Sequence, residues 1–222
     1  MTMMHNLFES NSSAWYIIQG AWVTLQYAGA STLLGFILGI ILSLFKLSHL
    51  RPLEYLARAY TSIFRGTPLL LQLSFIYFAI PALIGYEITA FEAGIAAFSL
   101  NSGAYISEII RAGIQAIDKG QFEAAQSLGL SYLQMMRDII LPQSLKNILP
   151  ALVNEMVNLL KESAIISTIG GADLMRRAQL VAADEYTYFG PLIIAGICYY
   201  TLVLILSSCA KLVENKLNTA TA

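Results

Sequence analysis

Polar and charged side chains interrupt one otherwise apolar stretch of the chain, residues 146–170. Placed at about 100° per helical residue, five of them share an arc of roughly 120°. They are Asn154, Glu155, Asn158, Lys161 and Glu162, and Ser163 follows directly. Lys161 could pair with a carboxylate, and Glu162 could pair with an ammonium group. This face therefore has the two kinds of partner that a zwitterion requires, and Glu162 would also suit a cationic side chain.

The composition sets the environment in which these groups work. Of the 222 residues, 57% are hydrophobic and only 12% are charged, whereas a soluble domain has about 25% charged residues. The net charge of -1 excludes a nucleic-acid binder with a basic surface. The sparse charge and many large apolar residues also exclude a disordered chain. We predict an all-α, multi-pass membrane protein that forms one transmembrane domain over residues 1–222.

Gaps between charged residues locate the membrane spans. A helix needs about 20 apolar residues to cross the hydrocarbon core, and residues 10–45, 66–86 and 186–210 contain no charge at all. Two further stretches are long enough but carry polar interruptions. The five predicted spans cover residues 15–45, 64–84, 88–112, 146–170 and 187–210.

The polar face of the fourth span admits two interpretations. Charged groups within a span are costly and mark a functional site by default, so the face could line a path for a solute. Alternatively, its members satisfy one another near the membrane edge, with Lys161 bonded to Asn158 or Asn154 and Glu162 bonded to Asn158. Under either interpretation, the face cannot point toward lipid.

The positions of Lys and Arg predict the orientation, because loops rich in these residues stay in the cytoplasm. The connections that follow the first, third and fifth predicted spans hold most of them, including Lys46, Arg51, Lys119, Arg137 and Lys211. The N-terminal tail and residues 87–92 have none. We therefore expect an external N-terminus and a cytoplasmic C-terminus.

Shorter patterns predict local features of the first three spans. Glu108 and Arg111 are spaced to form an ion pair within one helix. Thr67 precedes Pro68 and could cap a helix that begins there. Two glycines four residues apart, Gly35 and Gly39, would permit another helix to pack closely against the first span.

The connection between the third and fourth spans, residues 115–145, has helical character of its own. Gly129 can end a first short helix. Ser131 and Gln134 have the spacing of a capping box that begins a second one, and Pro142 is expected to end it. A short helix at the membrane face could dock into a groove of a cytoplasmic partner, or it could simply rest on lipid.

The motifs of this connection resemble those of a known family. The series Glu123-Ala124-Ala125, three residues, Gly129, nine residues, Ile139-x-Leu141-Pro142 is similar to the signature loop of ABC importer permeases. The surrounding residues narrow the resemblance to the polar amino acid uptake subfamily: Arg65-Gly66-Thr67-Pro68-Leu69-Leu70 with Gln72, Ala104-Tyr105, Glu108, Arg111-x-Gly113-Ile114, Gly120-Gln121, Asn154 and Leu160-Lys161. Most members continue with Asp-Thr-Ser-Leu where this chain has Glu162-Ser163-Ala164-Ile165.

The resemblance, which runs from about Trp15 to Leu217, implies a type I ABC importer permease in the bacterial cytoplasmic (inner) membrane. Such a permease pairs with a second permease, either the same chain or a sister chain. The pair binds two ABC ATPase subunits and receives an amino acid from an external solute-binding protein. The ATPase-coupling residues would be Glu123, Ala124, Ala125, Leu128 and Gly129, in a cytoplasmic coupling helix.

Two other functions compete with ATP-driven import. A stand-alone, ion-coupled amino acid carrier would use Glu155 and Glu162 as ion sites, but it leaves the motifs of residues 123–142 without a purpose. A membrane scaffold is the third possibility. The sequence has no nucleotide-binding Gly-rich loop with Lys-Ser/Thr, no metal-ligand spacing and no nucleophile paired with a base. We therefore expect no enzyme activity, no cofactor, no metal and no nucleic-acid partner, with ATP bound by the ATPase subunit.

Overall fold

The computed structural model describes residues 11–48 and 50–219, and all regular structure in that part of the chain is helical. The helices are α2 (Asn11–Leu47), α3 (Arg51–Gly66), α4 (Leu69–Ser74), α5 (Ile80–Ile84), α6 (Ala90–Gln115), α7 (Lys119–Ser127), α8 (Tyr132–Met135), α9 (Leu141–Glu162), α10 (Leu174–Asp184) and α11 (Phe189–Thr219). Two π-helical turns, η1 (Phe75–Ala79) and η2 (Met136–Ile140), and one 3-10 segment, η3 (Ser163–Ile169), connect some of them. The prediction of an all-α fold is confirmed for this range.

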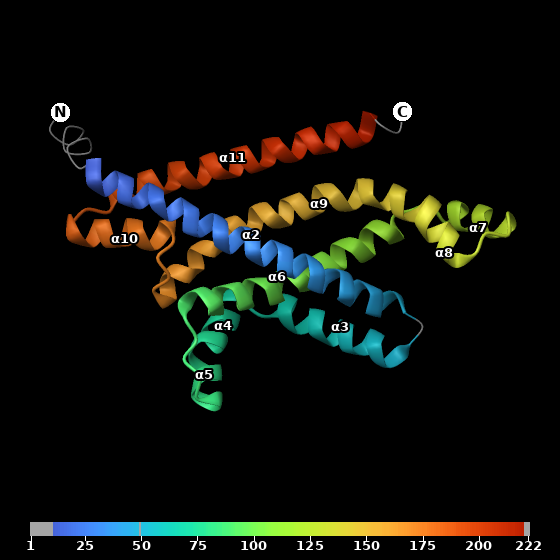
Figure 1. Cartoon of the computed structure of the whole chain (residues 1–222), viewed down its shortest axis with the longest axis horizontal. Coiled ribbons are helices and arrows are strands. Elements are labelled where there is room, and N and C mark those ends of the chain that lie inside the picture. The colour runs from blue at the N-terminus through green and yellow to red at the C-terminus, as the bar shows by residue number, and fades with distance from the viewer. Residues whose placement is uncertain (1–10, 49, 220–222) are drawn as a thin grey trace.

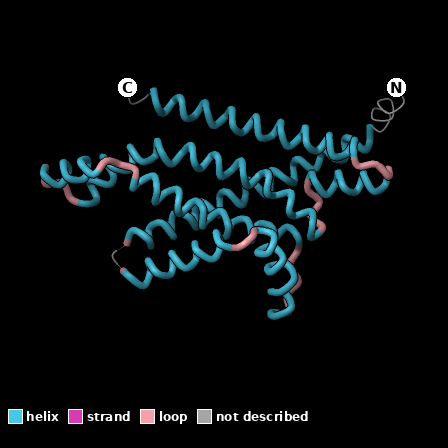
Figure 2. The backbone as a smooth tube through the Cα atoms, turned by 180° about the vertical axis from the view of Figure 1, so that it is seen from behind, coloured by secondary structure: helices cyan, strands magenta, loops and turns pink. Residues whose placement is uncertain are grey.

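Four long helices, α2, α6, α9 and α11, run along the long axis of the molecule (Figure 1). The short helices α7 and α8 lie at one end of this bundle, and α10 lies at the other. Helices α4 and α5 project from the side, which the reverse view also shows (Figure 2). The bundle therefore has two distinct ends and one lateral arm.

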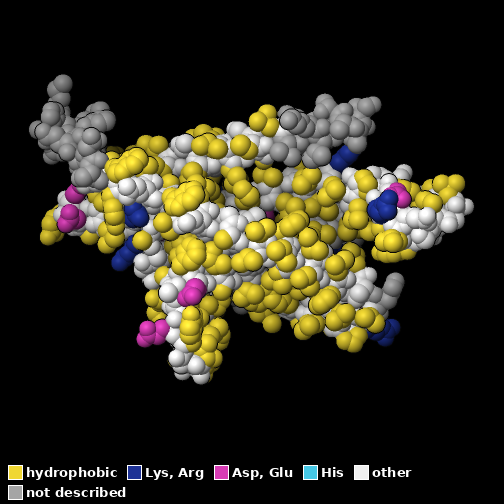
Figure 3. Space-filling model, in the orientation of Figure 1, with side chains coloured by type: hydrophobic (Ala, Val, Ile, Leu, Met, Phe, Trp, Pro, Cys, Tyr) yellow, Lys and Arg dark blue, Asp and Glu magenta, His cyan; other side chains and the backbone are white. Residues whose placement is uncertain are grey.

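Among the described residues, two helical segments are long and apolar enough to cross a membrane, Ser13–Leu47 and Phe189–Leu212. A third candidate is the pair formed by α3 and residues 69–84, which is bent by 103°. Helices α6 and α9 have the necessary length, with 26 and 22 residues, but not the apolar composition. Figure 3 shows hydrophobic side chains over most of one face, with charged ones toward the ends and around the lateral arm.

Helices α2 and α6 pack closely because α2 has glycine where α6 approaches. A Cβ atom added at Gly39 would lie 2.6 Å from Cγ2 of Ile106, and one at Gly35 would lie 3.0 Å from Cβ of Ser102. Real carbon atoms do not come as close as the first of these distances. The predicted close packing at this glycine pair is confirmed.

Polar side chains stabilise the break between α3 and α4. Gln72 donates from Nε2 to the carbonyl oxygens of Phe64 (2.8 Å) and Thr67 (3.0 Å). Asn101 of α6 donates to the same Phe64 oxygen and to Oε1 of Gln72. Backbone groups freed by a break must find such partners when they are buried away from water. Gln72 and Asn101, both buried, therefore make this break possible.

Two expectations about helix boundaries are wrong. Thr67 does not cap α4: the capping residue is Pro68, and the Thr67 hydroxyl donates to the carbonyl of Ile63 at 2.8 Å. Pro142 does not end a helix, because the chain remains helical through η2 and into α9. The π-helical turn accommodates the proline, whose ring would otherwise clash with the carbonyl four residues earlier. Pro81 follows η1 in the same way.

Candidate functional site

Most of the predicted polar face of α9 is open in the chain. Asn154, Asn158, Lys161 and Glu162 are exposed, and Glu155 is half-buried. Ser163 lies apart from them: it is fully buried at the start of η3 and donates to the carbonyl oxygen of Leu160 at 2.7 Å. The exposed members form a surface that has polar groups of both charges and is not covered by another part of the described chain.

The members of this face do not satisfy one another. Across residues 11–48 and 50–219, no hydrogen bond or salt bridge joins Lys161 to Asn158 or Asn154, or Glu162 to Asn158. The expected internal pairing is therefore absent from the described chain. Their ion-pairing and hydrogen-bonding capacity is available to a solute, to water or to a second subunit.

Buried hydroxyl groups of α2 and α6 add further polar groups to the helix bundle. Ser31 of α2 and Ser99 and Ser102 of α6 are buried, and their Oγ atoms have no hydrogen-bond partner within the described part of the chain. A serine is small enough to belong equally to close helix packing. Ser102 belongs to a polar cluster, Asn101-Ser102-Gly103, over which α6 nevertheless remains continuous.

The connection between α6 and α9 forms a compact tip at one end of the bundle. Gly129 has a φ of 72°, which is the left-handed region that glycine adopts without strain. The Leu130 N–H donates to the carbonyl of Ala125, and the Gly129 N–H to that of Gln126, so Gly129 ends α7 as predicted. The predicted capping box of Ser131 and Gln134 is present at the start of α8.

The predicted coupling residues divide between the two sides of α7. Ala125 is 1% exposed and packs with Met135 and Ile140 in a small apolar core. Glu123, Ala124 and Leu128 point outward. Leu128 is 78% exposed, and Leu133 and Tyr132 of the neighbouring helix α8 are 74% and 64% exposed. Ala125 thus anchors the tip, and the tip exposes several large apolar side chains and the Glu123 carboxylate.

A hydrogen bond links this tip to α9. Gln143 donates from Nε2 to Oε1 of Gln121 at 3.1 Å and to the carbonyl of Ile139 at 3.0 Å. Gln121 belongs to α7 and Ile139 to η2, so the Gln143 side chain connects α7 to the π-helical turn that leads into α9. A displacement of α7 would therefore act on α9 directly.

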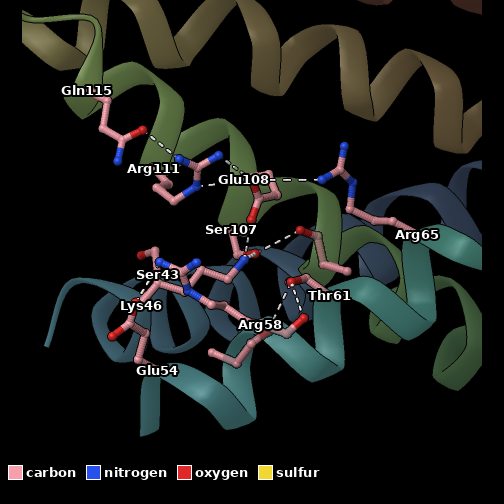
Figure 4. Close-up of polar contacts among 12 residues, drawn as sticks. Ser43, Lys46, Glu54, Arg58, Thr61, Arg65, Ser107, Glu108, Arg111 and Gln115 are labelled. Atoms are coloured by element: carbon pink, nitrogen blue, oxygen red, sulfur yellow. Dashed lines mark hydrogen bonds and ion pairs between the residues drawn. The ribbon is translucent and has the colours of Figure 1, made fainter. Parts of the chain in front are cut away.

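An ion-pair cluster occupies the surface of α6 that faces α2 and α3 (Figure 4). The predicted pair is present, with Arg111 Nη2 2.7 Å from Oε2 of Glu108. Two cations that the spacing did not indicate, Lys46 and Arg65, also approach Glu108. They come from other helices, so only the packing brings them together.

A buried acid, Asp173, caps α10 at the opposite end of the bundle. Its side chain accepts from the Arg176 N–H at 2.8 Å and from the Tyr199 hydroxyl at 3.2 Å. Burial raises the pKa of Asp173 to about 6, against the lowering effect of those hydrogen bonds. Sequence spacing alone did not single out this residue.

Comparison with known proteins identifies the class to which this architecture belongs. Residues 32–219 match the family described as binding-protein-dependent transport system inner membrane component. The chain belongs to this family. It is therefore a permease component of a transport system, not a stand-alone carrier, and ATP hydrolysis is carried out by a separate subunit.

Individual relatives extend over nearly the whole chain. The "Putative glutamine transport system permease protein GlnP" of Rickettsia bellii (strain RML369-C) is 53% identical over 215 residues, which cover 97% of this chain and 99% of the relative. The "Arginine transport system permease protein ArtQ" of Bacillus subtilis (strain 168) is 55% identical over 204 residues, covering 92% and 93%.

Solved structures show the same fold. A chain of an amino acid ABC transporter with histidines superposes with a TM-score of 0.87 at 45% identity, covering 90% of this chain and 94% of that one. A chain of the inward-facing MetNI methionine ABC transporter gives a TM-score of 0.77 at 20% identity, covering 94% and 99%. The second likeness concerns the fold alone.

Proposed function

We propose that this chain is the membrane-spanning subunit of an ATP-driven importer that carries a polar amino acid across the bacterial cytoplasmic membrane. The subunit pairs with a second permease, the same chain or a sister chain. It also binds two ABC ATPase subunits on the cytoplasmic side and receives its substrate from an external solute-binding protein. The exposed apolar tip of α7 and α8, beside Glu123, is the observation that carries this proposal.

The proposed topology has five spans, with the N-terminus outside and the C-terminus in the cytoplasm. They correspond to α2, to residues 64–84, which begin at the bend between α3 and α4, to α6, to α9 with η3, and to α11. Lys46 lies in the last turn of α2, Lys119 begins α7, and Lys211 lies in the C-terminal part of α11. The C-terminal ends of α2 and α11 lie at the end of the bundle that holds α7 (Figure 1), which supports a cytoplasmic location for that end.

In the proposed mechanism, the α7 tip transmits ATPase movement to the spans. Leu128 and its exposed apolar neighbours would enter a groove of the ATPase, and Glu123 would provide a polar anchor. Burial of Ala125 and the Gln143 bond to Gln121 give α7 a firm attachment. Movement of the ATPase would then tilt α9 and α6, which opens the path alternately to the two sides.

The polar face of α9 would line that path. Lys161 would pair with the substrate carboxylate, while Glu162 would pair with an ammonium group, and the Asn154 and Asn158 amides would hydrogen bond to either. Glu162 favours substrates with a cationic side chain. Relatives of similar identity are named for glutamine and for arginine, so both substrates belong in a transport panel.

Reconstitution of the complex tests this function. The chain is co-purified with its ABC ATPase, and uptake of labelled arginine, lysine, histidine and glutamine is measured with the loaded binding protein. We expect Glu123→Arg and Gly129→Trp to reduce ATPase recovery and uptake together. Asp184→Arg, an exposed charge reversal on α10 at the other end, is the matched control. Undiminished ATPase binding and uptake in both tip variants would refute the docking role.

A second experiment tests the α9 face. Glu162→Gln should weaken uptake of arginine more than uptake of glutamine, since only the former offers a cationic side chain. Lys146→Gln, which removes an exposed charge near the start of the same helix, should leave this preference unchanged. An equal effect of Glu162→Gln on both substrates would exclude a contact with the substrate side chain.

A further inference from the structure

Glu108 of α6 receives three cations from three places in the chain (Figure 4). Lys46 Nζ lies 2.5 Å from its Oε1, and Arg111 Nη2 lies 2.7 Å from its Oε2. Arg65 Nη1 lies 3.8 Å from the same Oε2. The carboxylate is thus the common partner of groups on α2, α3 and α6.

The burial of Lys46 makes the carboxylate difficult to replace. The Lys46 side chain is only 2% exposed, and its ammonium group donates to Glu108 and to Oγ of Ser107 at 2.8 Å. A buried ammonium requires a counter-charge, because its removal from water is otherwise costly. Neutralising Glu108 would leave Lys46 buried with only a hydroxyl partner among the described residues.

Two of these cations lie beside parts of the chain that move in the proposed mechanism, namely the bend between α3 and α4 and the connection from α6 to α7. Arg65 lies in the last turn of α3, immediately before the bend of 103° that leads to α4. Arg111 lies near the end of α6, where its Nη1 also bonds to Gln115, the last residue before the α7 connection. Glu108 therefore stands between the bend of the second span and the stem of the coupling loop.

Two other features hold Arg65 and α3 in this position. The Arg65 guanidinium lies over the ring of Tyr105 of α6, 5.2 Å from its centre. Further along α3, the Tyr60 hydroxyl donates to the carbonyl of Leu100 at 2.8 Å. Polar contacts thus fasten α3 to α6 at more than one level, and Glu108 adds α2 to the same assembly.

We propose that Glu108 is a positioning residue that fastens α2, α3 and α6 into one rigid unit, so that movement of the α7 tip reaches the bend between α3 and α4. The ion pairs hold the helices in a fixed relation that apolar side chains, which can slide past one another, do not impose. Without the carboxylate, α2 would lose its ion pair to α6 and Arg65 would keep only its contact with Tyr105, so less of the tip movement would reach the bend. The inference rests on the proposed function, in which the ATPase drives α7.

The test compares transport with ATP hydrolysis in the reconstituted complex. Glu108→Gln keeps the shape of the side chain but removes its charge. We expect the complex to assemble and hydrolyse ATP, while the amount of amino acid transported per ATP falls at least about fivefold. Glu54→Gln is the matched control, since it breaks an ion pair to Arg58 (2.6 Å) that lies within α3. Its transport per ATP should equal that of the wild type.

A double variant separates positioning from simple destabilisation. Lys46→Met with Glu108→Gln removes the unpaired buried cation, so it should restore thermal stability and assembly while transport per ATP stays low. Recovery of wild-type coupling in the double variant would overturn the inference, as would an unchanged ratio in assembled Glu108→Gln. If wild-type complex fails to respond to loaded binding protein, the proposed function itself is refuted instead.

Discussion

Because Asp173 is buried, the free energy of unfolding should depend on pH. The structure gives both the sign and the size of this dependence. The carboxyl group is 0% exposed, and burial raises its pKa from 3.8 to about 6. Between these values, the folded chain holds a proton that the unfolded chain has released. The free energy of unfolding must therefore fall as the pH rises from about 4 to about 6, and it should not fall further above that.

The size of the effect follows from the difference between the two pKa values. At 1.36 kcal/mol per pH unit, raising the pKa from 3.8 to about 6 corresponds to about 3 kcal/mol. The charged form has compensating partners in the Arg176 N–H and the Tyr199 hydroxyl. Tyr199→Phe should therefore raise the pKa further and extend the loss of stability to higher pH.

Asp173→Asn is the variant that isolates this titration. Asparagine caps helices as well as aspartate, so α10 should still begin at residue 174, but the variant has no charge to bury. Thermal unfolding of the purified complex, measured from pH 4 to pH 8 for both proteins, gives their difference at each pH. We expect the wild type to lose up to about 3 kcal/mol relative to the variant between pH 4 and pH 6. A difference that is constant across this range would refute the assigned burial.

Three further predictions concern the backbone. Gly129→Ala should destabilise the α7 tip by about 1–2 kcal/mol, because alanine is strained in the left-handed region. Gly29→Ala, in an open part of α2, is the control and should not destabilise the tip. Hydrogen exchange of the α7 amides measures the difference between the two variants. Gln72→Leu removes a donor to the Phe64 carbonyl and should cost about 1–3 kcal/mol in thermal unfolding, and unchanged stability would contradict this. Pro142→Ala should let η2 relax into an α-helix, which would rotate the tip relative to α9; unaltered spin-label distances across this junction would contradict it.

Local sequence signals predicted local structure well. The capping box of Ser131 and Gln134, the turn at Gly129 and the pair of Glu108 with Arg111 each depend on residues at most four apart. Such contacts form whenever the helix itself forms. The tip of α7 and α8 was therefore predictable in detail without knowledge of its surroundings.

Contacts between distant segments were beyond the reach of spacing. Lys46 and Glu108 are 62 positions apart, and the sequence alone indicates only that Lys46 marks the cytoplasmic end of the first span. The position of Lys46 is nevertheless distinctive in the sequence, since Lys46 is the first charged residue after a run of 36 uncharged residues. Only the parallel packing of α2 against α6, made close by Gly39, places its ammonium group beside Glu108.

The two prolines that follow π-helical turns show why Pro142 was wrongly expected to end a helix. A proline conflicts with the carbonyl four residues earlier, and a helix can answer by stopping or by widening for one turn. At both Pro81 and Pro142 the preceding N–H reaches back five residues, from Ile80 to Phe75 and from Leu141 to Met136. Widening keeps the axis continuous, so a push on the tip at α8 still reaches α9. A helix that ended at Pro142 would introduce a flexible connection between the tip and α9, where the proposed mechanism requires a rigid one.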